Sequence, residues 1–213
     1  MGLLFSRFAR VLSAVFLAAG LSACASFDGF DFSDLTISSL GRGEPEPVAM
    51  RWDHRPEAGE WTRMAFAALD THAAILPQIV PEDIDAWCPA YPDASEEERE
   101  MFWTGLLSAL ARHESTWNPQ AVGGGGRWFG LVQISPATAR YYGCEATTGA
   151  ALQDGAMNIS CALRIWAHTV PRDGVVATGR GGVAADWGPF HPSQAAKREE
   201  MRAWITSQPY CAG

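Results

Sequence analysis

Apolar residues recur at steps of three and four between residues 95 and 114, which is the spacing of one face of an α-helix. They are Phe102, Trp103, Leu106, Leu107 and Leu110. Ser95 and Glu98 precede this stripe three residues apart, the spacing of a capping box at a helix start. The pattern predicts a long helix that begins after Ser95 and ends before Asn118 and Pro119, which force the chain to turn.

A carboxyl group continues the apolar stripe at the end of this helix, because Glu114 follows Leu110 by four residues. Arg112 and His113 point to other faces, so we expect partial burial to raise the pKa of Glu114. A carboxylic acid that stays protonated near neutral pH can give its proton to a leaving oxygen. The alternative is a glutamate at a frayed helix end that faces water.

The residues after Pro119 predict a glycine loop at 123–126, a short extended hairpin at 127–134 and a helix. That helix starts at Ser135-Pro136 and ends at Gly143. Upstream, the pattern from 60 to 76 predicts an amphipathic helix with His72 as a satisfied core histidine.

The N-terminus has the features of an exported lipoprotein. Two arginines precede a short apolar run within residues 1–20, which is typical of a signal peptide and too short to span a bilayer. The sequence Leu21-Ser22-Ala23-Cys24 resembles the lipobox of bacterial lipoproteins, in which the Cys is lipidated. We therefore expect a signal peptide at 1–23, a flexible tether at 24–58, a domain at 59–213, and anchoring at the periplasmic face of the outer membrane. The alternative is an ordinary signal cleaved near Ala25.

Charge and composition restrict the partners. The formal net charge is −8 and the basic residues are scattered, which argues against nucleic acid as a partner. Contact with a membrane is expected through the lipid anchor only. Nine Trp residues offer platforms for sugar rings or apolar ligands. No heptad repeat is present, so we expect a monomer.

The four remaining cysteines predict two disulfides, with three possible connectivities. We favour Cys144–Cys161, across a short loop, and Cys88–Cys211, which ties the C-terminus to the body of the domain. A zinc site is the competing interpretation, but no CxxC or HxxxH spacing supports it. No metal or other cofactor is expected.

Two sequence blocks resemble the catalytic domain of soluble lytic transglycosylases. The first, Glu-Ser-Thr-Trp-Asn-Pro at 114–119, matches the Glu-Ser-x-x-Asn-Pro start of that family's signature. The second, at 130–139, matches Gly-Leu-x-Gln-Ile-x-Pro-x-Thr-Ala. Both the order and the separation of the blocks agree. A third block, at 152–159, resembles the family segment in which an Asn-Ile pair opens a helix along the cleft. Here this helix is expected from about Gly155 to Thr169.

The resemblance implies a mainly α, lysozyme-like α+β fold: a helical bundle around a glycan-binding cleft, with a short β-hairpin. It also implies cleavage of the β-1,4 bond between N-acetylmuramic acid and N-acetylglucosamine in peptidoglycan glycan strands. Family members do this without adding water and leave 1,6-anhydromuramoyl ends. Glu114 matches the single catalytic acid and base of the family.

Supporting roles follow from the same resemblance. Ser115 and Gln133 match hydrogen-bond donors near the cleaved bond, and Asn158 matches a polar group on the cleft wall. The family's late aromatic-Asn-Ala-Gly block, which supplies a Tyr, is replaced here by the sequence Ala-Ala-Asp-Trp-Gly at 184–188. Trp187 or Asp186 could occupy the equivalent space, or Tyr141 or Tyr142 could approach from another helix.

Two other functions stay open at this point. One is a hydrolase of lysozyme type, in which Asp154 or Asp186 serves as base or nucleophile beside Glu114. The other is a non-catalytic glycan-binding lipoprotein whose tryptophans stack on sugars. The four candidates are Trp103, Trp117, Trp128 and Trp187.

Overall fold

The computed structural model describes residues 49–212. The predicted signal peptide and the predicted lipidation site Cys24 lie outside these residues. The α-helices are α1 (Ala58–Leu69), α2 (Ile75–Gln78), α3 (Glu96–Ser115), α4 (Pro136–Tyr141), α5 (Gly149–Leu152), α6 (Gly155–Asp173), α7 (Ala195–Thr206) and α8 (Pro209–Ala212). Short 3-10 turns are η2 (Ile84–Ala86), η3 (Tyr91–Asp93), η4 (Gly182–Ala185), η5 (Gly188–Phe190) and η6 (Pro192–Gln194). Two strands, β1 (Val122–Gly123) and β2 (Trp128–Phe129), complete the mainly helical fold.

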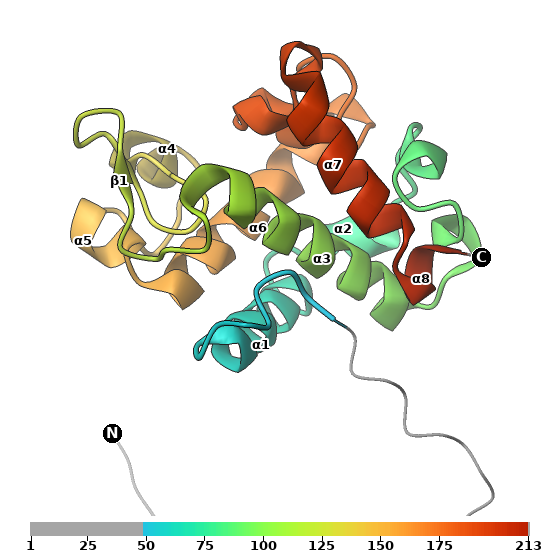
Figure 1. Ribbon diagram of the computed structural model, residues 1–213, viewed down its shortest axis with the longest axis horizontal. Helices are drawn as coiled ribbons and strands as arrows, with labels where there is room; N and C mark the ends of the chain where they lie inside the picture. The colour runs from blue at the N-terminus through green and yellow to red at the C-terminus, as the bar shows by residue number, and fades with distance from the viewer. Residues whose placement is uncertain (1–48, 213) are drawn as a thin grey trace, which may run out of the picture. The chain divides into compact units, whose positions relative to one another are not determined.

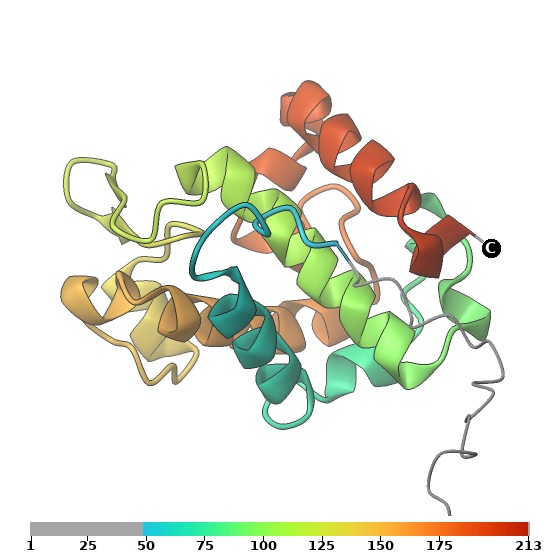
Figure 2. The same ribbon diagram turned by 60° about the horizontal axis from the view of Figure 1, so that its bottom comes forward.

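Helix α3 crosses the middle of the domain, and the other long helices pack around it (Figures 1 and 2). Its start is the predicted capping box: the Ser95 hydroxyl accepts from the Glu98 amide, and the Glu98 carboxylate accepts from the Ser95 amide. The apolar stripe of α3 is fully buried, with Trp103 packed between Phe102 and Trp166 of α6. This packing fixes the C-terminal end of α3, where Glu114 lies.

The packed domain begins before the predicted boundary at residue 59. Met50 and Trp52 are buried, and the backbone amide of Arg51 donates to the hydroxyl of Ser108 in α3. Trp52 packs edge-on against Trp61 and donates to Thr62. The predicted tether at 24–58 therefore extends too far at its C-terminal end. The buried side chains of Met50 and Trp52 attach this Pro- and Asp-rich segment to the core.

The predicted helix at 60–76 is divided in two. Helix α1 ends at Leu69, and the Thr71 hydroxyl donates to the carbonyl of Ala67, competing with the helical pattern. His72 then contacts the Ser160 carbonyl through Nε2 at 3.1 Å, as expected of a satisfied core histidine. Helix α6 was predicted from Gly155 to about Thr169 and continues to Asp173.

The hairpin involves different residues from those predicted. Strand β1 pairs antiparallel with β2, so that Val122 faces Phe129 and Gly123 faces Trp128. The glycine stretch is thus the turn of the hairpin, and Gly124, Gly125 and Gly126 all adopt positive φ. Phe129 also forms an isolated antiparallel bridge with Ile134. Of the predicted hairpin at 127–134, this bridge is the pairing that the structure contains.

Two disulfides join distant parts of the domain, and they are the pairs favoured from the sequence. Cys144–Cys161 connects the segment after α4 to α6, and Cys88–Cys211 connects the segment after η2 to α8. Within residues 49–212, no helix has the length and apolarity that a membrane crossing requires.

Candidate active site

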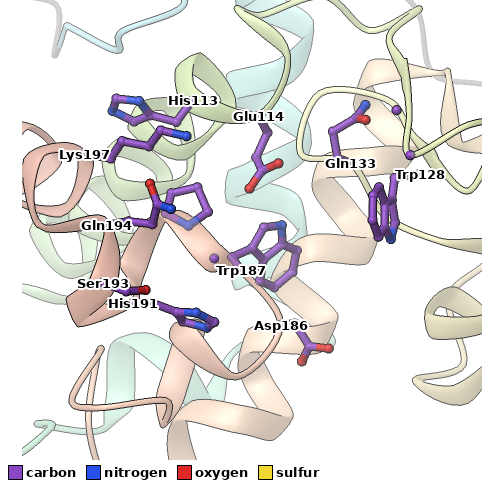
Figure 3. Close-up of a pocket in the computed structure, with 14 residues that line it drawn as sticks. His113, Glu114, Trp128, Gln133, Asp186, Trp187, His191, Ser193, Gln194 and Lys197 are labelled. Carbon is purple, nitrogen blue, oxygen red and sulfur yellow. The ribbon is translucent and has the colours of Figure 1, made fainter.

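A pocket of about 490 Å³ lies at the C-terminal end of α3. One side is the hairpin with the following loop, and the other side is the segment from η5 into α7 (Figure 3). The lining residues are His113, Glu114, Gly123, Gly124, Trp128, Gln133, Asp186, Trp187, Gly188, Pro189, His191, Ser193, Gln194 and Lys197.

Glu114 projects its carboxyl group into the space between these two sides (Figure 3). Burial raises the pKa of Glu114 to about 7, and the positive charge of Lys197 offsets only part of this effect. No arginine or lysine among the described residues forms an ion pair with Glu114. A group with this pKa can both give and take a proton near neutral pH.

Gln133 lies on the hairpin side of the pocket. Its Nε2 donates to the carbonyls of Ala121 at 3.2 Å and Gly130 at 2.9 Å, which fixes the amide plane. Its backbone has φ of 54°, a strained conformation for a residue other than glycine. A Cβ at Gly123 would lie 2.2 Å from Oε1 of Gln133, so any larger residue at this position would displace the amide of Gln133.

Two tryptophans line the pocket in different ways. Trp187 is buried, and its Nε1 donates to the Val132 carbonyl at 2.7 Å, so it supports the floor of the pocket. Trp128 is 42% exposed and packs against Gly124 and the guanidinium group of Arg127. Trp128 is thus the aromatic surface that a ligand in this pocket can reach.

Asp186 also lines the pocket, but its carboxylate points away from Glu114 (Figure 3). Its Oδ2 accepts a hydrogen bond from the hydroxyl of Tyr142 at 3.1 Å. Partial burial raises the pKa of Asp186, against the opposing effect of this hydrogen bond. Asp154 lies outside the pocket, because its carboxylate accepts from the Met157 amide and caps α6.

Three residues predicted to contact substrate do not line the pocket. Ser115 donates to the Leu131 carbonyl at 2.7 Å and accepts from the Asn118 amide, so it joins the two motif blocks. Asn158 is fully buried and bonds to backbone groups on both sides of Gly130. Tyr141 is 82% exposed and borders a separate hollow with His168 and Arg172. Ser115 and Asn158 lie outside the pocket because backbone groups engage their side chains, and Tyr141 lies outside it because α4 directs its ring to the other hollow. Their contact with substrate stays a prediction.

The stacking role considered for Trp103 is wrong, and Trp117 has partners of its own within the fold. Trp103 is buried in the core and donates to the hydroxyl of Tyr91. Trp117 donates to the Ser108 carbonyl and packs against His54. Neither residue lines the pocket.

Sequence reasoning missed the η5–α7 side of the pocket. His113 bonds through Nε2 to the Glu200 carboxylate at 2.6 Å, and His191 contacts the Ala184 carbonyl at 2.7 Å. Gln194 and Lys197 come from the start of α7. The sequence places His113 directly before Glu114. It gives no such indication for the residues of α7, because this helix lies outside the matched motifs.

No group of three His, Cys, Asp or Glu side chains that could hold a metal ion occurs in the described part of the chain. The pocket chemistry consists of carboxyl, amide, hydroxyl, indole, imidazole and ammonium groups.

Comparison with known proteins identifies the fold and the domain. Residues 93–173 match the family described as the transglycosylase SLT domain, and the mainly helical structure with a short two-stranded sheet is consistent with the lysozyme-like fold of that domain. Solved structures of Bd0314 DslA, in a wild-type form and as two glutamate-to-glutamine mutants, are 26% identical to this chain. They cover 77% of this chain and 98% of their own, with TM-scores of 0.70 to 0.71. No curated protein matches the chain.

Proposed function

We propose that this protein is a peptidoglycan lytic transglycosylase that uses Glu114 as its single acid and base. The SLT domain supports the transglycosylase class. The observation that carries the finer proposal is the position of Glu114: a half-buried carboxyl group with a pKa near 7, directed into a pocket of sufficient size for sugar rings.

In the first step, the protonated Glu114 gives its proton to the glycosidic oxygen between N-acetylmuramic acid and N-acetylglucosamine. The bond from that oxygen to the anomeric carbon then breaks, and the N-acetylglucosamine side leaves as an alcohol. The acetamido oxygen of the muramoyl sugar attacks the anomeric carbon and holds the positive charge. This substrate group replaces the second carboxylate that most glycosidases need.

In the second step, the Glu114 carboxylate takes the proton of the muramoyl 6-hydroxyl. The 6-oxygen attacks the anomeric carbon and displaces the acetamido oxygen, which gives a 1,6-anhydro ring. Glu114 ends protonated, as it began, and no water is consumed. Asp154, which caps a helix, and Asp186, which points away, leave Glu114 as the carboxyl group directed into the pocket.

A digest of purified glycan strands by the full chain, with products resolved by mass, tests this mechanism. We expect anhydromuramoyl ends from the wild type and none from Glu114→Gln. Glu100→Gln is the matched control, since Glu100 also lies on α3 and also has a pKa raised to about 7, but lies outside the pocket. It should leave the products unchanged.

A lysozyme-type hydrolase is the second candidate, because Asp186 lines the same pocket with a raised pKa. It predicts reducing ends that carry one added water, and their loss in Asp186→Asn. A wild type that binds strands but yields neither product would indicate a glycan-binding lipoprotein.

We further propose that Cys24 is lipidated and anchors a monomeric enzyme at the periplasmic face of the outer membrane. The lipobox-like sequence supports this proposal. Metabolic labelling with a fatty acid, in wild type and Cys24→Ala, tests the lipidation, and membrane fractionation tests the location. Unlabelled wild-type protein would contradict it.

A further inference from the structure

Lys197 is the only lysine of the chain; every other residue in the Lys and Arg count is an arginine. It belongs to the first turn of α7 and lines the pocket opposite the hairpin. Figure 3 shows its side chain extending toward the space in front of Glu114. The sole ammonium group of the side chains thus lies beside the proposed catalytic acid, in a chain with a formal net charge of −8.

The ammonium group of Lys197 forms no hydrogen bond and no ion pair with any residue that the structure describes. The other basic side chains of the pocket are engaged, His113 with Glu200 and His191 with the Ala184 carbonyl. Its charge nevertheless reaches Glu114, whose pKa it lowers without pairing with it. A cation held in a sugar-sized pocket without a protein partner is available to an anionic group of a ligand.

We propose that Lys197 is a specificity-determining residue that binds a carboxylate on the muramoyl arm of the substrate. This inference rests on the proposed function. N-acetylglucosamine is uncharged, whereas muramic acid carries a lactyl group on its 3-oxygen. This group ends in a free carboxylate in peptide-free strands, or in an amide that leads to the carboxylates of the stem peptide. Both sources present the same chemistry to the ammonium group.

The ammonium group of Lys197 therefore favours binding of the muramoyl sugar, rather than N-acetylglucosamine, on the side of the pocket nearest α7. This placement orients the strand, since the sugar that contributes the 6-hydroxyl must be the muramoyl one. A neutral oligomer of N-acetylglucosamine would fill the same space without this contact.

Kinetics on three substrates test the inference. Wild type and Lys197→Met are compared on peptide-free strands, on the same strands with carboxylates converted to methylamides, and on peptide-bearing strands. We expect Lys197→Met to lower kcat/KM on carboxylate-bearing strands by about 5- to 10-fold, mainly through KM, as an ion pair in a partly exposed site allows. On methylamide strands only the influence of Lys197 on the pKa of Glu114 remains, so the loss should be smaller there than on carboxylate-bearing strands.

Two variants complete the comparison. Lys197→Arg keeps the charge and should retain most of the preference for carboxylate strands. Arg202→Met removes a positive charge further along α7, where Arg202 pairs with Glu199 outside the pocket, and should not change the preference. A loss on peptide-free strands assigns the lactyl carboxylate, and a loss only on peptide-bearing strands assigns the stem peptide.

The single lysine also permits a direct observation. Reductive ¹³C-methylation keeps the charge and labels Lys197 and the N-terminal amine if it is free, so the lysine signal can be followed by NMR in Glu114→Gln. A peptide-free tetrasaccharide of alternating N-acetylglucosamine and N-acetylmuramic acid should shift this signal, and a tetramer of N-acetylglucosamine should not.

Equal losses of Lys197→Met on carboxylate and methylamide strands, or equal shifts with both tetrasaccharides, would overturn the inference. Such results would mean that Lys197 acts only through its effect on the pKa of Glu114 and does not bind a carboxylate of the substrate. The proposed function fails separately, through the absence of anhydromuramoyl ends from the wild type on every strand.

Discussion

The carboxylate of Glu200 lies 2.6 Å from Nε2 of His113, the residue directly before Glu114. The same carboxylate pairs with Arg51 at 2.6 Å and with Arg112. Glu200 of α7 therefore joins the end of α3 to the N-terminal segment of the domain. Because Lys197 precedes Glu200 by one turn of α7, this cluster also holds Lys197 beside the end of α3, where Glu114 lies.

Replacing Glu200 with Gln should destabilise the domain at neutral pH and matter less in acid. Burial tends to raise the pKa of Glu200, but hydrogen bonds from Arg51 and His113 outweigh it and lower the pKa below 4.5. A lowered folded-state pKa means that the stabilisation is present above about pH 4.5 and is lost as pH falls through the folded value. We expect a loss of about 1–2 kcal/mol at pH 7, or about 2–8 °C in Tm. Thermal melts from pH 3 to 8 check this, and a pH-independent difference would contradict it.

Activity should decline as pH rises through about 7. The first proposed step needs a protonated Glu114, and burial raises the pKa of Glu114 to about 7. The initial rate of anhydromuramoyl formation, measured from pH 5 to 9, should show this alkaline limb. A rate that stays flat to pH 9 would oppose the role of Glu114 as the acid.

The same burial means that ionised Glu114 lowers the free energy of unfolding. Since its folded-state pKa is raised, its favourable contribution exists at low pH and is lost as pH rises through about 7. Glu114→Gln should therefore be more stable than wild type at pH 8, by roughly 3 kcal/mol or about 6–12 °C in Tm. At pH 4 the two melting curves should coincide.

The helices that form the pocket were predictable where one local signal dominates. The capping box at Ser95 and the stripe that leads to Glu114 placed α3 correctly, because both depend on residues within a few turns. The turn of the hairpin was misplaced, since the pairing of Val122 with Phe129 depends on how a glycine stretch folds back. The burial of Trp52 could not be predicted, because it depends on packing against Trp61 of α1 and on the bond that attaches the neighbouring Arg51 amide to Ser108 of α3.

The site was predictable only on the side that the sequence motifs encode. Glu114 and Gln133, which belong to the matched motifs, line the pocket. Trp187 also lines it, and it was one of several candidates for the place of the missing family block. Ser115 and Asn158 instead bond to backbone groups, and no local pattern distinguishes a polar side chain that faces ligand from one that secures a loop. Lys197 gave no signal, because its position beside Glu114 arises from the packing of α7 on α3.

Asn158→Ala should disrupt the loop that carries Gln133. The buried amide of Asn158 accepts from the Val132 amide at 2.9 Å and donates to the carbonyls of Phe129 and Leu152. Alanine leaves three backbone groups without these partners, which should cost about 2–4 kcal/mol in the free energy of unfolding. Urea denaturation measures this. Asn158→Asp keeps the acceptor for Val132 but places a buried carboxylate oxygen against the carbonyls of Phe129 and Leu152, so it should lose at least as much stability as alanine. A loss below about 0.5 kcal/mol in Asn158→Ala would refute the argument.

The Cys144–Cys161 disulfide should stabilise the domain measurably. It closes a loop with a sequence separation of 17, and a cross-link of this length contributes about 3 kcal/mol by restricting the unfolded chain. The double variant Cys144→Ala, Cys161→Ala should lose this amount in denaturant unfolding. A reducing agent should destabilise the wild type further than the variant, which retains Cys88–Cys211.

Trp128 should affect substrate binding while leaving the fold intact. Its indole is 42% exposed at the pocket and packs against the hairpin turn and the side chain of Arg127, outside the buried core, so its removal opens no core cavity. Trp128→Ala should raise KM about 3- to 10-fold, as expected for the loss of aromatic contact with a sugar ring, with kcat and Tm nearly unchanged. Trp128→Phe should recover most of the affinity, because a smaller aromatic face remains. A fall in kcat at unchanged KM would instead mean that the indole positions the hairpin against Glu114, and that the sugar lies elsewhere in the pocket.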